Sequence, residues 1–472
     1  MKFKKIAVFI ISAVTAVSSL TAFSSFAELT TENENQFSDG SVVYEKIKNG
    51  LKVVKCDSSI TEIKISDKVN GYDVIEVDEK AFSGIEKLKS VALPDSVKSI
   101  GKYAFSNCLS LESVELPEDI TELPEGLFAN CQYLSSMDIP ESVTVVGMGA
   151  FMNCFSLEEL NLPDSIISLE DYALNNCYGL KSLELPANLE NIGSLALGGL
   201  YSLTDLTIDS KNTSFTIDDN ILYDKDKKTL YLSTDTERSG EFSIPDTVTS
   251  IEGYAFSGCT NITSVTIPES VKRIGDDAFS YCSSLKEVNF SSGIEEIGNY
   301  AFQYDKLIET ISLPATVRKI GAGAFADDTA LTSVIIPEGV SSIGAAAFFN
   351  CSSLNSVSLP STIQTVGEYA LGFVENSDSS DAVLKENFSL SVFSDSPAKD
   401  YAKTNGINYD TADLNLKSLI FIVICVVVLI IVIALAVRIM KKSSKNENNK
   451  TEIPDSADEN YKSIIDEDDS DK

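Results

Sequence analysis

Cysteine is the residue type in this chain most able to do chemistry, because thiols attack electrophiles, form disulfides and bind metal ions. Nine cysteines occur. Seven of them form two series spaced by 23 residues or a multiple of 23: Cys108, Cys131, Cys154 and Cys177, then Cys259, Cys282 and Cys351. The chain has no histidine, which excludes Ser-His-Asp and Cys-His catalysis and zinc sites built on histidine. We therefore expect no enzyme, no cofactor and no metal site.

The regular spacing of the cysteines argues against disulfides. In a stack of coils, cysteines one repeat apart would lie about 4.8 Å apart with parallel Cα–Cβ bonds. A disulfide needs Cβ atoms about 3.8 Å apart that converge. We therefore predict buried free thiols that act as small core residues. Asp305 and Asp328 take the same repeat position in two units, while Cys56 and Cys425 lie outside the series.

A repeat of 23 residues must position these side chains. Ten of the thirteen prolines fall on its phase: Pro94, Pro117, Pro140, Pro163, Pro186, Pro245, Pro268, Pro314, Pro337 and Pro360. Ser291 holds the same phase between Pro268 and Pro314. A fixed period of this length is typical of a solenoid, in which each coil buries its apolar face against the next.

Within each unit, the apolar pattern predicts a short strand and a second apolar segment. The spacing L-x-x-L-x-L around Leu111 is that of a leucine-rich repeat, and its last residues alternate as on a half-buried strand. The pair Ala104–Phe105 suggests one helical turn opposite the strand. At the position of Asn107, Asn or Gly recurs in most units, and these residues would end that turn in a left-handed conformation. The predicted fold is an α/β solenoid plus one transmembrane helix.

These residues resemble the BspA-like, or Treponema-type, leucine-rich repeat family. The matching motif is (I/L)PxxVxxIGxxAFxxCxxLxxVxL, and the resemblance covers residues 71–371. Members of this family are typically secreted or surface proteins. The resemblance therefore implies an extracellular binding surface for a ligand that it does not specify. It does not imply an enzyme.

The remaining segments are predicted from their composition. The divisions are a signal peptide at 1–27, a linker at 28–40, an N-terminal cap at 41–70, a first repeat block at 71–208, a hairpin island at 209–244, a second block at 245–382 and a C-terminal cap at 383–413. A first membrane span is the alternative for residues 1–27, although its apolar run is short. The C-terminal cap also resembles that of the family.

Residues 418–437 are predicted to cross a membrane, because they are almost wholly apolar and carry no charge before Arg438. Basic residues follow the span, which places residues 438–472, a polar acidic tail, in the cytoplasm. The repeats would then lie outside the cell, as in a single-pass type I membrane protein. The net charge of −33 argues against binding of nucleic acid.

Two rows of side chains are candidate ligand sites. The first points outward from the strands, which line the concave face of a leucine-rich coil; it includes Glu115, Asp138, Asn161 and Glu184 and would favour a cationic partner. The second is an aromatic row of Phe155, Tyr178 and Tyr201, which could hold sugar rings or peptide side chains. A merely solvated face and partial burial between coils remain the alternatives.

The predicted function follows from these features together. We expect a membrane-anchored extracellular protein that binds a protein or a cell-wall or host polysaccharide at the cell surface. The main alternative is a structural scaffold of an envelope membrane complex. A glycan-cleaving enzyme is a third class, since carboxylates are abundant, although no pair of them is marked by its spacing.

Overall fold

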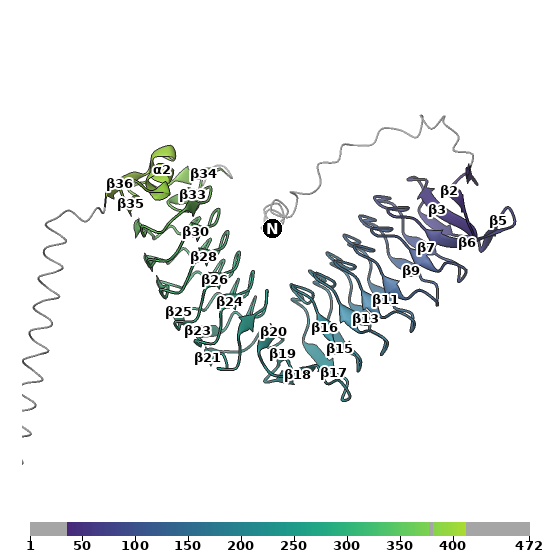
Figure 1. The fold of residues 1–472 in the computed structure, drawn as a ribbon, viewed down its shortest axis with the longest axis horizontal. Helices are drawn as coiled ribbons and strands as arrows, with labels where there is room; N and C mark the ends of the chain where they lie inside the picture. The colour runs from purple at the N-terminus through teal and green to yellow at the C-terminus, as the bar shows by residue number, and fades with distance from the viewer. Residues whose placement is uncertain (1–34, 377–380, 412–472) are drawn as a thin grey trace, which may run out of the picture. The chain divides into compact units, whose positions relative to one another are not determined.

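The computed structural model describes residues 35–376 and 381–411. The chain divides after Asp410 into two units, and the first one holds the repeats. Successive coils stack through parallel strands (Figure 1). Among the described residues, the one α-helix is α2, Pro397–Thr404, which begins after the N-cap residue Ser396.

The N-terminal strands precede the regular coils. They are β1 (Gln36–Ser38), β2 (Val42–Ile47), β3 (Gly50–Cys56), β4 (Glu62–Lys64), β5 (Lys68–Val69) and β6 (Tyr72–Val77). Strand β2 pairs antiparallel with β1 and β3, and β3 pairs in parallel with β6. Strands β4 and β6 then pair in parallel with the first regular coil, so this segment leads directly into the stack.

Each regular coil contributes a main strand, which carries the leucine-rich pattern. In the first block these are β7 (Ser90–Ala92), β9 (Ser113–Glu115), β11 (Ser136–Asp138), β13 (Glu159–Asn161), β15 (Ser182–Leu185) and β17 (Asp205–Ile208). In the second they are β21 (Gly240–Ser243), β23 (Ile262–Ile267), β25 (Glu287–Phe290), β27 (Thr310–Ser312), β29 (Ser333–Ile335) and β31 (Ser356–Ser358). Paired neighbours keep a register of 23 residues, as in Asp138 opposite Asn161.

A second ladder of two-residue strands runs along another side of each coil. In the first block it comprises β8 (Ser99–Ile100), β10 (Glu122–Leu123), β12 (Val145–Val146), β14 (Ser168–Leu169) and β16 (Asn191–Ile192). In the second it comprises β22 (Ser250–Ile251), β24 (Arg273–Ile274), β26 (Glu296–Ile297), β28 (Lys319–Ile320), β30 (Ser342–Ile343) and β32 (Thr365–Val366).

The predicted helical turn in every coil is wrong, and the fold is a β-solenoid. The segment around Ala104–Phe105 forms turns, because two of its residues have left-handed backbones: Tyr103 has φ 57° and Asn107 has φ 59°. An L-residue in this region costs about 1–2 kcal/mol in a helix and stops it. Asn107 is left-handed as expected, but it does not end a helix.

The hydrogen bonds of this segment explain why turns replace the helix. Alternate N–H groups donate to the next coil: Tyr103 to the Glu125 carbonyl at 2.9 Å, and Phe105 to the Leu127 carbonyl at 3.0 Å. The N–H of Ser106, the residue after Phe105, instead donates back to the Tyr103 carbonyl of its own coil at 3.1 Å. The backbone is thus satisfied by a ladder between coils, which a helix would forgo.

Glycine seven residues after the proline allows the coils to approach closely. A Cβ atom on Gly321 would lie 2.4 Å from the carbonyl carbon of Gly298, and one on Gly367 would lie 2.3 Å from the Ala345 nitrogen. Real Cβ atoms do not reach such distances to backbone atoms. These glycines are required by contact between backbones, whereas left-handed geometry is needed at other positions.

The core consists of rows in which one residue type recurs from coil to coil. Five phenylalanines of the second block stack in sequence, with ring centroids 5.2–5.3 Å apart: Phe256, Phe279, Phe302, Phe325 and Phe348. The first block stacks Phe82, Phe105, Phe128 and Phe151, and Leu174 then takes the next place. Both rows are buried.

An island separates the two blocks. It holds β18 (Phe215–Asp218), β19 (Ile221–Asp224) and β20 (Thr229–Ser233), and β19 pairs antiparallel with both neighbours, where the hairpin was expected. Leu222 and Leu232 belong to the core of the first block, while Ile221 and Leu230 belong to that of the second. Strand β20 then pairs in parallel with β22, so the island starts the second ladder anew.

The last described elements close the second block. They are β33 (Phe373–Glu375), β34 (Ala382–Leu384), β35 (Ser389–Val392), α2 and β36 (Asn408–Thr411). Strand β35 pairs in parallel with β31, and the Tyr401 hydroxyl of α2 donates to the Leu371 carbonyl at 3.0 Å. Helix α2 therefore packs on the final coil.

The predicted membrane span at 418–437 and signal peptide at 1–27 lie outside the described residues. Within the described ranges, no helix has the length and apolar character needed to cross a membrane.

Candidate functional site

The row of cysteines is structural. All eight cysteines that the structure describes are free and buried, as predicted. Six of these thiols donate to the carbonyl of the phenylalanine in the preceding coil, for example Cys108 to Phe82 at 3.1 Å and Cys282 to Phe256 at 3.3 Å. Burial raises the pKa of the Cys108 thiol to about 12. A thiol that stays protonated is a poor nucleophile, so these residues fill the core.

Two aspartates interrupt this row in the second block. Asp305 and Asp328 are fully buried, and the Asp305 N–H donates to an Asp328 carboxylate oxygen at 2.9 Å. Burial raises the pKa of both carboxyls well above the ordinary range. Within the described ranges, both carboxylate oxygens of Asp305 and one of Asp328 have no hydrogen-bond partner. Such groups remain protonated near neutral pH, because an unpaired charge is costly in the core.

No group of three or more Cys, Asp or Glu residues in the described part of the chain is arranged to hold a metal ion. The aspartate pair is accordingly a feature of the core and offers no open surface to a substrate.

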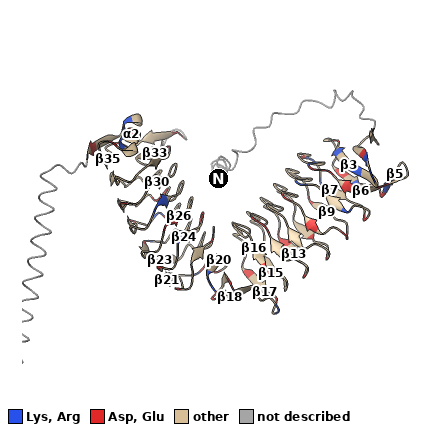
Figure 2. Ribbon diagram, viewed as in Figure 1, with Lys and Arg blue, Asp and Glu red and all other residues tan. Residues whose placement is uncertain are grey.

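The acidic row on the strands is exposed. Glu115 ends β9, Asp138 ends β11, and Glu184 lies in β15; all three are open to solvent. Figure 2 colours the acidic positions of the ribbon red. Asn161 lies directly opposite Asp138 across the β11–β13 pair. Since side chains alternate along a strand, the inward neighbours Met137 and Leu183 are buried. The structure thus holds these polar groups one repeat apart, or two, along one side of the stacked coils.

The equivalent row of the second block is neutral. It consists of Thr266, Asn289, Ser312, Ile335 and Ser358, all of them exposed. Ile335 leaves 58% of its surface open to solvent, which is unusual for so apolar a residue in a regular strand. The two blocks therefore offer different surfaces from the same repeat position.

The predicted aromatic row is real as a row of contacts. Phe155 and Tyr178 stack with centroids 4.9 Å apart at 7°, and Tyr178 meets Tyr201 at 5.4 Å and 32°. Phe155 and Tyr178 are half-buried, and Tyr201 keeps 46% of its surface exposed. Both faces of the Tyr178 ring are covered by its neighbours. The row therefore presents mainly ring edges to a ligand.

The aromatic row continues beyond the residues that the sequence indicated. Tyr254, the first tyrosine of the second block, meets Tyr201 edge-on at 6.4 Å, and Tyr281 stacks on Tyr304 at 4.7 Å. The sequence signal was hidden, because Tyr201, Tyr254 and Tyr281 occupy three different positions of the repeat. Only the break in the repeat at the island brings those positions together.

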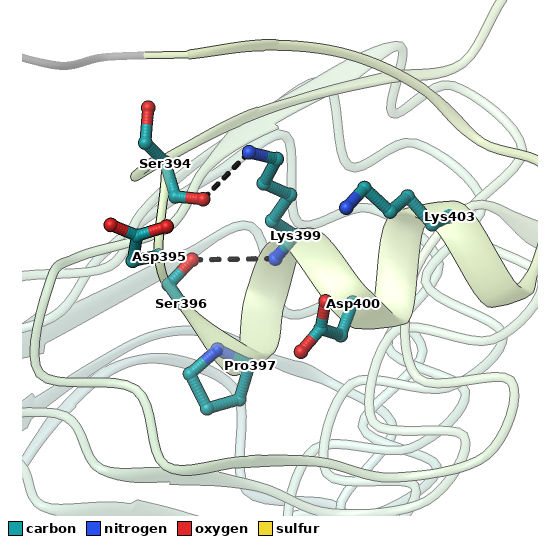
Figure 3. A pocket seen from close by; sticks show the side chains of 7 residues that line it. All are labelled: Ser394, Asp395, Ser396, Pro397, Lys399, Asp400 and Lys403. Atoms are coloured by element: carbon teal, nitrogen blue, oxygen red, sulfur yellow. Dashed lines mark hydrogen bonds between the residues drawn. The ribbon is translucent and has the colours of Figure 1, made fainter.

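One shallow hollow lies at the start of α2. Figure 3 shows Lys399 reaching back to the Ser394 carbonyl, with Nζ–O at 2.6 Å, and the Lys399 N–H donating to the Ser396 hydroxyl at 3.3 Å. The second bond is the helix cap itself. The Lys399 ammonium is thus already bonded inside the hollow and is not open to a ligand.

A comparison with protein families decides the classification. The BspA type leucine rich repeat region matches this chain in six copies, over residues 53–163, 144–240, 234–351 and 318–389. The chain belongs to this family. BspA-type proteins are cell-surface proteins, and their fold is typically a non-enzymatic binding scaffold. No protein with a curated function matches this BspA-type chain.

Solved structures show the same fold. A leucine rich cell surface protein from Faecalibacterium prausnitzii is 24% identical with a TM-score of 0.54, over 81% of this chain and 96% of that one. The pneumococcal vaccine antigen PcpA is 20% identical with a TM-score of 0.58, over 80% of this chain and 98% of that one. At such identity the likeness concerns the fold alone.

Proposed function

We propose that this BspA-type protein binds a protein partner at the cell surface through the outward face of the first-block strands. The observation that carries the proposal is the exposed row of Glu115, Asp138 and Glu184, which lie one or two repeats apart along the main strands of the stacked coils. Carboxylates in such a row attract a partner that carries basic side chains and speed its approach. Leucine-rich repeat surface proteins generally bind proteins, which agrees with this choice.

A protein ligand suits the aromatic row better than a polysaccharide does. Sugar rings stack on exposed aromatic faces, yet the Tyr178 ring is covered on both sides by Phe155 and Tyr201. Ring edges carry partial positive charge and favour carbonyl oxygens, aromatic faces and thioethers. Peptides supply all three groups, so we place a polypeptide on this row as well.

The mode of attachment remains a prediction of the sequence. Residues 418–437 would anchor the protein in the membrane, with residues 1–27 directing export and the repeats outside the cell. Protease treatment of intact, wall-stripped cells tests this arrangement. We expect removal of the repeats and retention of a small fragment that contains the tail. A protected repeat region would contradict the predicted orientation.

Arrays test the class of ligand directly. We expect the full-length chain to bind a subset of proteins on a surface and secreted-protein array, and to bind none of the polysaccharides on a glycan array run in parallel. Binding to glycans alone would overturn the choice of a protein partner. Binding to neither array, together with recovery of the chain in a stable membrane complex, would favour the scaffolding alternative.

A further inference from the structure

A group of tyrosines surrounds one carboxylate where the two blocks meet. Tyr254 follows the island and packs on the last full coil of the first block. Its ring is edge-on to Tyr201, and its Cδ2 atom lies 2.6 Å from the position that a Cβ of Gly198 would take. Glycine at 198 therefore leaves the space that the Tyr254 ring fills. The contact fixes this tyrosine between the blocks.

The carboxylate is that of Asp277, one repeat after Tyr254 and partly buried. Its backbone is left-handed, with φ 56°, as at the equivalent position of Tyr254, where φ is 61°. Burial is the main cause that raises the pKa of the tyrosines around Asp277, and the Asp277 carboxylate raises it further. These tyrosines are Tyr178, Tyr201, Tyr254, Tyr281 and Tyr300. These rings come from both blocks and converge on one negative group.

Asp277 has hydroxyl partners but no cation. Burial raises its pKa to about 7, with the Asp276 carboxylate acting in the same direction, while hydrogen bonding to Tyr254 and Ser280 opposes the shift. Among the described residues, no Lys or Arg contributes to this shift. The neighbouring Arg273 serves Asp276, with Nη2–Oδ1 at 3.6 Å.

A second tyrosine–aspartate pair in the second block has a lysine beside it. Burial raises the pKa of Tyr304, and the Asp327 carboxylate of the next coil raises it further. This pair lies two coils further along. There the ammonium group of Lys306 lies 5.5 Å from the centre of the Tyr304 ring and lowers the pKa of Asp327, although burial still raises it overall. The chain thus supplies its own lysine to one pair and none to the other.

We propose that Asp277, Tyr201 and Tyr254 form a binding site for the ammonium or guanidinium group of a basic side chain on a protein partner. The Asp277 carboxylate would accept charge-assisted hydrogen bonds from that cationic group, beside the Tyr201 and Tyr254 side chains. This site is separate from the acidic row on the strands. It can therefore bind a small cation whether or not that row binds a partner.

Protonation of Asp277 competes with the cation. Below its pKa the carboxyl is neutral and offers the ligand no charge, so binding should strengthen as the pH rises through about 7. The tyrosines around it do not titrate in this range, because burial raises the pKa of Tyr201 and Tyr254 above its usual value.

N-acetyl-lysine-methylamide is the probe, titrated into the full-length chain and followed by NMR or calorimetry. We expect saturable binding that is roughly tenfold or more weaker at about pH 5.5 than at about pH 8.5. The norleucine analogue lacks the ammonium group and should not bind. Absence of saturable binding at both pH values, or equal binding at both, would overturn the proposal without any variant.

Variants locate the site. Asp277→Asn should abolish binding of the lysine probe, whereas Asp327→Asn, in the pair that already holds Lys306, should leave it unchanged. Circular dichroism confirms that both variants fold. Equal binding by wild type and Asp277→Asn would contradict the site. Tetramethylammonium tests whether the ligand is instead a quaternary ammonium group. If it bound more tightly than the lysine probe, the proposal of a protein side chain as the ligand would be wrong.

Discussion

The first and second blocks are built from the same coil but differ in what fills it. In the first block the thiol row is uninterrupted from Cys108 to Cys177, the strands carry an acidic outer row, and an amide ladder joins Asn107 to Asn176. In the second, two aspartates break the thiol row, the outer row is neutral, and Tyr281 and Tyr304 take places of the amide ladder.

The difference separates positions that hold the scaffold from positions that are free to vary. Close-approach glycines and buried aliphatic residues recur in both blocks, because any change there would collide with the next coil. Outward positions on the strands vary, because water accepts most side chains. We therefore place function in the varying positions, and we expect substitutions in the two sets to affect different measurements.

The largest loss of stability is expected for Phe302→Ala in the centre of the five-ring stack. Phe302 contacts Phe279 and Phe325, both at 5.3 Å, and is fully buried. Truncation should lower the free energy of unfolding by about 3–5 kcal/mol. Phe302→Leu copies the first block, where Leu174 fills this place, and should cost below about 1.5 kcal/mol. If Phe302→Ala and Phe302→Leu lowered the free energy of unfolding in urea equally, filling this position in the stack would not contribute to stability.

The next effect concerns the aspartates that interrupt the thiol row. Their folded-state pKa lies well above the unfolded value of about 4, so the folded state holds protons that the unfolded state has lost. Stability should therefore fall as the pH rises above about 4. The double variant Asp305→Cys, Asp328→Cys restores the row of the first block and should flatten this dependence.

Urea unfolding between about pH 5 and about pH 9 checks this second comparison. At the upper end we expect the double variant to exceed the wild type by about 1–3 kcal/mol, the typical cost of an unsatisfied buried polar group. A wild type that is equally stable across the range would show that the two carboxyls find partners in solution.

The smallest stability effect is expected in the amide ladder of the first block. Asn153 donates to the Asn130 side chain at 2.7 Å and accepts from Asn176 at 2.9 Å. Asn153→Gly keeps the left-handed backbone, as Gly258 does at the same position of the second block, but it removes both bonds. A loss of about 1 kcal/mol is expected from thermal unfolding. A loss as large as that of Phe302→Ala would place the ladder among the core elements.

Sequence reasoning found the features that repeat. The proline phase, the strand ending at Glu115 and the burial of Cys108 all follow from a fixed period and alternating polarity. The helical turn was wrong, because an Ala-Phe pair fits a buried turn as well as a helix. Tyr103 has a left-handed backbone, which prevents a helix here. Tyrosine rarely adopts this conformation, so its residue type did not predict it.

The residues that we propose for binding were predictable only in part. The acidic row that contains Asp138 and the aromatic row that contains Tyr178 could be predicted, because the residues of each row occupy the same position in successive repeats. The tyrosines around Asp277 could not be read, because their approach depends on how the island joins Tyr201 to Tyr254. That contact belongs to the interruption of the repeat, so no periodic pattern carries it.

The measurement closest to the central claim is binding by the outer-row variant Glu115→Ser, Asp138→Ser, Glu184→Ser. The matched control, Thr266→Ser, Asn289→Ser, Ile335→Ser, changes the same strand positions in the second block. Against a protein captured on the array, we expect the acidic-row variant to bind at least tenfold more weakly with a flatter salt dependence, because exposed carboxylates act through screened charge. The control should bind as the wild type does. Unchanged affinity and salt dependence in the acidic-row variant would contradict the account.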